Sequence, residues 1–350
     1  MALSYRDAAL DPTANPDPAL VRALQTDLRA LGYLRRTIDG RFGPDTQLAV
    51  RRLQHDLLHN TGASTAHDGR APVAMTAYNR GVTSTTGVVD AALADSIEAL
   101  LNERDFPHLP RSNDPAAANR SLLATLATTA SAVAPTPYLL AIFAQESQCQ
   151  HYAVPATSGD ADSFITLGLD TNPDTPNQVN SRGYGIGQYT LFHHPPRAAE
   201  VAAFMADPLR NANAAFAVLR SKFDSFLVGS TAETRADDRA SEHPLLALRQ
   251  CRYGPGDPRF LLACRDCARE ARKLDIVPET PVYYRSTETY GQASAYDDPH
   301  YTGVPDRADF KCDWPYAVRR YNGSGPNSYN YQARVLLGLL APPPASGAAA

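Results

Sequence analysis

The fold is decided around one stretch of sequence, which runs from Pro135 to Gln150 and reads PTPYLLAIFAQESQCQ. Thr136 is a competent helix N-cap and Pro137 suits the first helical turn, where its missing N–H costs nothing, so a helix is predicted to begin here. Most of the helix surface is apolar, which predicts burial. Glu146, near the helix end, is a candidate functional carboxylate. Taken alone, this stretch favours a glutamate that simply reaches solvent from the last turn.

The composition predicts a chain of two domains, because 350 residues can bury a core in each. The formal net charge is -4, 20% of the residues are charged and no block of Lys and Arg occurs, which argues against a nucleic-acid partner. No apolar run approaches the roughly 20 residues of a membrane span. The start, MALSYRD, lacks the basic and apolar regions of a signal peptide. We therefore expect no membrane insertion, and synthesis in the cytoplasm without a Sec signal.

The five cysteines are odd in number and too sparse for a disulfide scaffold. Four of them lie in the second half of the chain. These four could hold zinc, form disulfides or stay free thiols, and the loose spacing makes zinc the weakest of the three. No metal or cofactor is predicted. The cysteines are Cys149, Cys251, Cys264, Cys267 and Cys312.

The N-terminal part of the chain has the pattern of short amphipathic helices. Residues 1–17 read as a loose leader. Apolar residues spaced at three and four positions predict a helix from Leu20 to Leu31, which Gly32 ends. A sharp turn follows, and a second helix is predicted to open at Asp45 or Thr46.

A run of residues in this region has a recognisable pattern: Leu24-Gln25, Leu28, Leu31-Gly32-Tyr33, Ile38-Asp39-Gly40, Phe42-Gly43, Thr46, Ala49-Val50 and Leu53-Gln54. It closely resembles the small three-helix peptidoglycan-binding domain, and residues 86–90 with the helix after them resemble its closing part. The resemblance implies a domain over residues 18–103, a linker over 104–119 and binding to bacterial peptidoglycan. An inserted loop, 61–85, departs from the family. The leucines and glycines also suffice for a fold that binds no ligand.

Beyond the linker, the sequence predicts helices over residues 120–133, 207–226 and 329–340, and a disordered tail over 341–350. Residues 151–181 read as a solvated loop, because their aspartates lack the spacing of a calcium loop. The segment from Ser181 to Tyr189 holds glycines at alternate positions, with no preceding strand expected and no phosphate-binding spacing. It is better interpreted as backbone that lets a bulky ligand such as a sugar approach, with Gln188 supplying an amide.

Three motifs occur in order: Glu146-Ser147 at a helix end, Gly185-Ile186-Gly187-Gln188, and Tyr321-Asn322-Gly323 before the final helix. Together they resemble the lytic transglycosylase domain over residues 120–340. The fold class that this resemblance implies is mainly α: a small three-helix wall-binding domain followed by an α-helical lysozyme-like domain with long loop insertions. Gly187 stands where the family usually has Met, Arg320 replaces Ala, and insertions near 151–180 and 227–310 lengthen the gaps.

The same resemblance implies the roles of individual residues. Glu146 would protonate the oxygen between N-acetylmuramic acid and N-acetylglucosamine, then take the proton of the muramic C6 hydroxyl, leaving a 1,6-anhydro end. Apolar surroundings make a carboxyl costly to ionise, which would raise its pKa toward the range of a general acid. Tyr321 would orient Glu146, unless it is a buried tyrosine with another partner. The sugar contacts would be Ser147, Gly185, Gln188, Tyr189 and Asn322, the last being also a natural turn residue.

The expected function is therefore that of a peptidoglycan lytic transglycosylase. One alternative is a hydrolytic muramidase that uses Asp160, Asp162 or Asp170 as a second carboxylate. Another is a non-catalytic, wall-binding structural protein. The chain would act in the periplasm or cell wall, as a phage endolysin or a type VI secretion effector. Its partners besides peptidoglycan would then be a holin, a secretion apparatus or an immunity protein.

Overall fold

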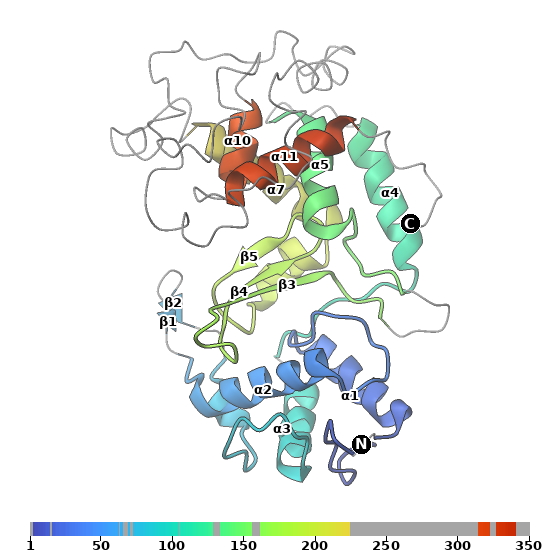
Figure 1. The fold of residues 1–350 in the computed structure, drawn as a ribbon, viewed down its shortest axis with the longest axis vertical. Coiled ribbons are helices and arrows are strands. Elements are labelled where there is room, and N and C mark those ends of the chain that lie inside the picture. Colours follow the sequence, from blue (N-terminus) through green and yellow to red (C-terminus); the bar gives the residue numbers. More distant parts are fainter. Residues whose placement is uncertain are drawn as a thin grey trace. The chain divides into compact units, whose positions relative to one another are not determined.

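The protein is mainly α-helical, as predicted, and its described residues also form a three-stranded and a two-stranded antiparallel sheet (Figure 1). It divides into two compact units, the first made of residues 1–119 and 150–211, and the second of residues 120–149 and 212–350. The predicted C-terminal domain, 120–340, is thus shared between the two. The computed structural model describes residues 3–14, 16–62, 64–65, 69–70, 73–104, 106–128, 134–155, 162–224, 314–322 and 327–340.

Three helices, joined by turns, form the N-terminal part of the first unit. They are α1 (Pro18–Ala30), α2 (Pro44–His59) and α3 (Ala91–Asn102). The Asp17 carboxylate accepts a hydrogen bond from the Ala19 N–H at 2.8 Å, and Asp90 caps α3 in the same way. These side chains satisfy N–H groups that the first helical turn leaves without partners. Between α2 and α3 lie the short pair β1 (Ser64–Thr65) and β2 (Gly69–Arg70), and the 3₁₀ turn η1 (Met75–Tyr78).

Two glutamines fasten the turns that precede α2 and α3. Gln25 donates from Nε2 to the Asp39 carboxylate at 2.9 Å and accepts the N–H of Gly40 at 2.8 Å. Gln54 accepts the N–H of Gly87 at 2.8 Å in an equivalent arrangement. Both glycines have positive φ, 77° and 79°, which L side chains rarely adopt. Each Leu-Gln pair of the sequence pattern therefore places a leucine in the core and an amide on a turn.

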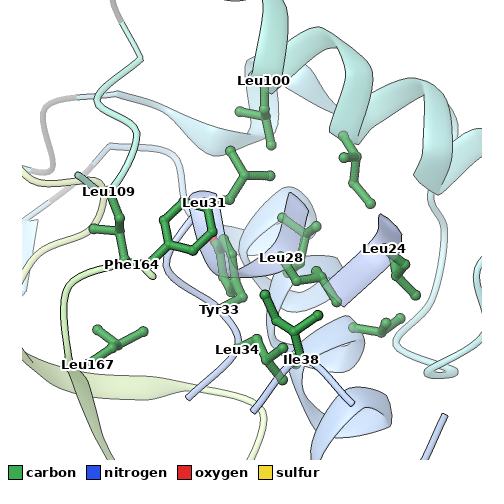
Figure 2. Close-up of a cluster of buried hydrophobic side chains, with 14 of the residues drawn as sticks. Leu24, Leu28, Leu31, Tyr33, Leu34, Ile38, Leu100, Leu109, Phe164 and Leu167 are labelled. Atoms are coloured by element: carbon green, nitrogen blue, oxygen red, sulfur yellow. The ribbon is translucent and has the colours of Figure 1, made fainter. Parts of the chain in front are cut away.

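The core of the first unit draws on both of its chain segments (Figure 2). Leu28 of α1 and Leu31 just after it belong to one buried cluster with Leu100 of α3, and Phe164 and Leu167 join it from the later segment. This shared apolar cluster explains why residues 150–211 group with the N-terminal helices, since burial of apolar surface drives such association.

Segments predicted to be loose also pack into this unit. Tyr5 of the predicted leader is fully buried and donates to the Asp27 carboxylate at 2.6 Å. In the predicted linker, Phe106 and Leu109 are buried, and the Leu109 N–H donates to the Ala30 carbonyl at 2.8 Å.

Part of the sheet lies where a solvated loop was predicted for residues 151–181, and that prediction is wrong for residues 167–171 and 179–181. Strands β3 (Leu167–Thr171), β4 (Val179–Tyr184) and β5 (Tyr189–Leu191) pair antiparallel in sequence order. Leu167 and Leu169 are buried, so one face of β3 packs against the core. The remaining positions are polar or glycine, which hid the alternation of a strand.

The second unit contains helices from distant parts of the chain. Their bounds are α4 (Pro115–Thr128, entering from the first unit), α5 (Thr136–Ser147), α7 (Pro208–Phe223), α10 (Trp314–Tyr321) and α11 (Asn327–Leu340). Before α7, the short α6 (Ala198–Glu200) leads into a π-helical turn, η2 (Val201–Met205). The helix α10 was not predicted. Residues 227–310 and 341–350, for which insertions and a tail were predicted, lie outside the described residues.

Candidate functional site

Glu146 lies in the last turn of α5, and its side chain is partly exposed. The helix has Pro135 as its N-cap, one residue before the predicted Thr136, and its apolar residues are buried as predicted. It ends at Gln148 and Cys149, both with positive φ, and the Cys149 N–H donates to the Phe143 carbonyl at 3.0 Å. The negative end of the helix dipole therefore points at Glu146. A carboxylate there is electrostatically unfavourable unless other groups compensate for it.

Two tyrosines from other helices lie close to Glu146. Burial raises the pKa of Tyr321 on α10, and the charge of Glu146 raises it further. Burial and then the Glu146 charge likewise raise the pKa of Tyr331 on α11, well above its usual value. The two rings are nearly parallel, with an interplanar angle of 9° and centroids 6.4 Å apart. Both phenols thus keep their protons at neutral pH beside the carboxylate.

The packing of α11 on α5 brings Tyr331 to Glu146. Tyr331, Val335 and Leu339 are buried and share one face of α11, being four residues apart. Further along α11, a Cβ placed on Gly338 would lie 3.5 Å from the Ala141 Cβ of α5. Because Tyr331 is near Glu146 and Gly338 is near Ala141, the two helices run antiparallel.

Two further contacts position α10 within the same unit. The Gln332 side chain donates to the Pro315 carbonyl at 2.9 Å, which ties α11 to α10. The Trp314 ring packs on Phe223 of α7, with centroids 4.2 Å apart. The only tryptophan of the chain is therefore a core residue. Tyr331 was missed by sequence reasoning, because a tyrosine in a helix carries no signal until the neighbouring helix is known.

Ser147 and Asn322, predicted sugar contacts, differ in exposure. Ser147 is buried, and its hydroxyl donates to the Phe143 carbonyl one turn earlier at 3.0 Å. This hydrogen bond stabilises the last turn of α5. Asn322 is exposed just beyond α10, where its N–H donates to the Arg319 carbonyl at 3.2 Å. Gly323 of the same motif lies outside the described residues.

Gly185, Gln188 and Tyr189 belong to the first unit, where residues 185–188 connect β4 to β5. A strand does precede this turn, contrary to the prediction. Gly185 has a φ of 72°, and a Cβ on it would lie 2.6 Å from the His151 ring, so only glycine fits. The Gln188 side chain folds back and donates to the Gly185 carbonyl at 2.7 Å. A Cβ on Gly183 would lie 2.7 Å from its Oε1. The glycines thus make room for Gln188 itself, where the sequence suggested a ligand.

His151 and Asn211 clamp this turn, and neither was singled out from the sequence. The Ile186 N–H donates to His151 Nδ1 at 3.3 Å, which leaves the proton on Nε2 to be donated to the Met205 carbonyl at 2.8 Å. Asn211 accepts the Gly187 N–H at 2.8 Å. Burial lowers the pKa of His151 to about 4. The turn is therefore held by a neutral imidazole that makes two hydrogen bonds.

Acid should weaken this clamp. The ordinary pKa of a histidine is 6.5, so between pH 6.5 and about 4 the unfolded chain binds a proton that the folded chain does not. Stability should fall over that window as the pH decreases, by roughly 3 kcal/mol in all for this one group. Urea unfolding at a series of pH values measures it. His151→Gln, which can replace both hydrogen bonds without titrating, should show a shallower pH dependence; identical curves would contradict the assignment.

Tyr189 is partly exposed and stacks on Phe204 of η2, with ring centroids 4.2 Å apart and an angle of 11°. Both rings are partly exposed, so this aromatic pair beside the β4–β5 turn remains a candidate sugar contact.

The candidate second carboxylates are engaged within the first unit. Asp162 is buried, with its Oδ1 3.3 Å from Nε of the equally buried Arg29. Asp170 accepts the Ser181 hydroxyl at 3.0 Å. Asp160 lies outside the described residues.

Metal and membrane predictions can be examined only in the described part of the chain. There, no group of three metal-ligating side chains occurs, and no helix has the length and apolarity needed to cross a membrane. Cys149 is a free, half-buried thiol whose pKa burial raises to about 11. The other four cysteines fall outside the described residues.

Comparison with known proteins identifies one region. Searches of curated proteins and of solved structures found no match. Residues 17–57, which contain α1, the Gln25-fastened turn and α2, match the model of the family described as "Putative peptidoglycan binding domain". This match supports a peptidoglycan-binding domain at the N-terminal end of the chain and an association with peptidoglycan.

Proposed function

We propose that this protein cleaves the glycan strands of peptidoglycan, between N-acetylmuramic acid and N-acetylglucosamine, as a lytic transglycosylase with Glu146 as the general acid. The observation that supports the proposal most is the placement of Glu146: a partly exposed carboxyl at a helix C-terminus, facing the protonated phenols of Tyr321 and Tyr331. The peptidoglycan-binding domain, which associates the chain with the cell wall, supports the choice of substrate.

The chemistry needs one carboxyl group that gives a proton and takes one back. Glu146 protonates the glycosidic oxygen while the bond from that oxygen to the muramic C1 breaks. The muramic C6 hydroxyl then attacks C1 and returns its proton to the Glu146 carboxylate, which restores the acid and consumes no water. Between the two steps Glu146 is an anion, and the two phenols can donate hydrogen bonds to it.

The partners of two of the three candidate second carboxylates favour this reaction over hydrolysis, and the third, Asp160, lies outside the described residues. Hydrolytic glycosidases use a pair of carboxylates that flank the scissile bond. The Asp162 carboxylate is buried in its ion pair with Arg29, and Asp170 holds the Ser181 hydroxyl. Both therefore have structural partners. The deciding experiment is mass spectrometry of the products from purified sacculi: 1,6-anhydro ends support the proposal, and products heavier by one water indicate a hydrolytic muramidase.

The setting that we propose is antibacterial lysis, by a phage endolysin or a secreted effector that acts in the periplasm. Wall association supports this setting, and the delivery partner would be a holin or a secretion apparatus, with an immunity protein in the second case. Expression with an added export signal should be toxic to the host cell, whereas cytoplasmic expression should not.

Tyr331 should act as a positioning residue. Tyr331→Phe removes the hydroxyl that faces Glu146 and keeps the ring, so kcat should fall roughly 10-fold while KM changes little. Without this donor the ionised form of the site is less stable, so the alkaline limb of the pH–rate profile should move to higher pH. Tyr321→Phe should act in the same direction.

The matched control is Tyr152→Phe, whose hydroxyl lies 3.5 Å from the Ala206 carbonyl in the first unit. It loses the same atom and should retain both the rate and the pH profile. An unchanged profile in Tyr331→Phe would contradict the role proposed for that hydroxyl.

A further inference from the structure

Three arginines of the first unit form a cluster, which we call the arginine cluster: Arg35 after α1, Arg52 on α2 and Arg182 on β4. The Arg182 side chain is only 4% exposed. Its Nη2 lies 3.5 Å from Asp56 Oδ2, and its guanidinium carbon lies 5.4 Å from the centroid of the Tyr33 ring. Asp56 is one helical turn after Arg52 on α2, so the ion pair brings Arg182 alongside Arg52.

Positive charge exceeds negative charge around Arg52 of this cluster. Asp56 is shared, because it also accepts the Tyr33 hydroxyl at 2.7 Å. Among the described residues, the buried Nε atoms of Arg52 and Arg182 have no hydrogen-bond partner. Burial lowers the pKa of Arg52, and the charges of Arg182 and then Arg35 lower it further, against a smaller opposing effect of Asp45. At Arg52, the effects of the two other guanidinium groups therefore each exceed that of Asp45.

The cluster is accessible from solvent, since Arg35 is exposed and Arg52 is partly exposed, although Arg182 is buried. A partly desolvated cation that lacks an anion is costly, and an anion that supplies the missing charge recovers that cost. A guanidinium group can also make two parallel hydrogen bonds to a carboxylate, which the ammonium group of a lysine cannot.

We propose that the arginine cluster binds a free carboxylate of the peptidoglycan stem peptide. The proposal rests on the wall association of the N-terminal domain and is independent of the proposed cleavage. Arg35 and Arg52 lie within the residues that match the peptidoglycan-binding family, whereas Arg182 comes from outside them. The site is thus completed by β4, and the matched domain by itself would hold only part of it.

The test is co-sedimentation of the full chain with purified sacculi, in a Glu146→Gln background so that the wall stays intact. Arg52→Gln should weaken binding roughly 10-fold at low ionic strength, and less at high salt. Arg52→Lys keeps the positive charge but loses the paired N–H donors of the guanidinium group. Its binding should be weaker than that of the parent and stronger than that of Arg52→Gln. The control is Arg36→Gln, an exposed neighbour of Arg35 with the same change in net charge, which should bind like the parent.

Chemical variants of the wall identify the anion. Sacculi whose carboxylates have been amidated should bind the parent about as weakly as Arg52→Gln binds untreated sacculi, with no further loss for the variant. Sacculi stripped of wall phosphates should bind normally. Equal binding by Arg52→Gln and the parent, equal losses for Arg36→Gln and Arg52→Gln, or a loss that follows phosphate removal would each overturn the site. No binding by the parent would contradict wall association itself, and activity on sacculi would still report separately on cleavage.

Discussion

Glu146→Gln should abolish the release of soluble muropeptides from purified sacculi. The amide has nearly the shape of the carboxyl but carries no proton that it can give to the glycosidic oxygen, so the first step of the proposed reaction fails. Loss of a general acid costs on the order of 10²–10⁴ in rate. The rate of muropeptide release, followed by chromatography, measures the effect.

The fold and wall binding should survive this change, because Glu146 is partly exposed and neither packs in a core nor belongs to the peptidoglycan-binding domain. Glu98→Gln, a carboxyl on α3 that belongs to no proposed site, makes the same chemical change and should keep full activity. Full activity in Glu146→Gln would sink the proposed mechanism. A variant that still sediments with sacculi and no longer cleaves them would separate binding from catalysis.

Asp162→Asn should lower the free energy of unfolding by roughly 3 kcal/mol or more, because it leaves the Arg29 guanidinium buried without its anion. Both side chains are almost fully buried, at 2% exposure for Arg29 and 6% for Asp162. Burial lowers the pKa of Arg29 and raises that of Asp162, in each case against the effect of the partner. Urea unfolding of the full chain measures the loss, and Asp170→Asn, which affects one partly exposed hydrogen bond, should lose about 1 kcal/mol or less.

The same variant separates a structural aspartate from a catalytic one. At a temperature where Asp162→Asn is still folded, it should release the same products as the parent. A variant of undiminished stability that no longer cleaves sacculi would instead make Asp162 the second carboxylate of a hydrolase.

Local patterns predicted most of the helices, though not α10, because each of those depends on residues within a few positions. The spacing of leucines, the aspartate caps and the glycine after α1 all act within one or two turns, and α1, α2 and α3 lie within a few residues of the predicted ranges. The sheet was missed for the converse reason. Its strands are short and rich in polar residues and glycine, so their pairing depends on the neighbouring strand and the core beneath more than on any local propensity.

Sequence alone determined the helical class and indicated the peptidoglycan-binding domain, because helix periodicity and turn glycines are visible in adjacent residues. It also proposed Glu146, a lone acid in an apolar helix, whose role stays a prediction. Tertiary structure decided what surrounds these residues. Tyr331 meets Glu146 only because α11 packs antiparallel on α5, and Arg182 joins Arg52 only because its side chain reaches Asp56 of α2. The Gln188 side chain donates a hydrogen bond to the Gly185 carbonyl of its own turn. His151 and Asn211 hold the same turn through the N–H groups of the residues between Gly185 and Gln188. Contacts between distant segments follow from the burial of shared apolar surface, which no local pattern specifies.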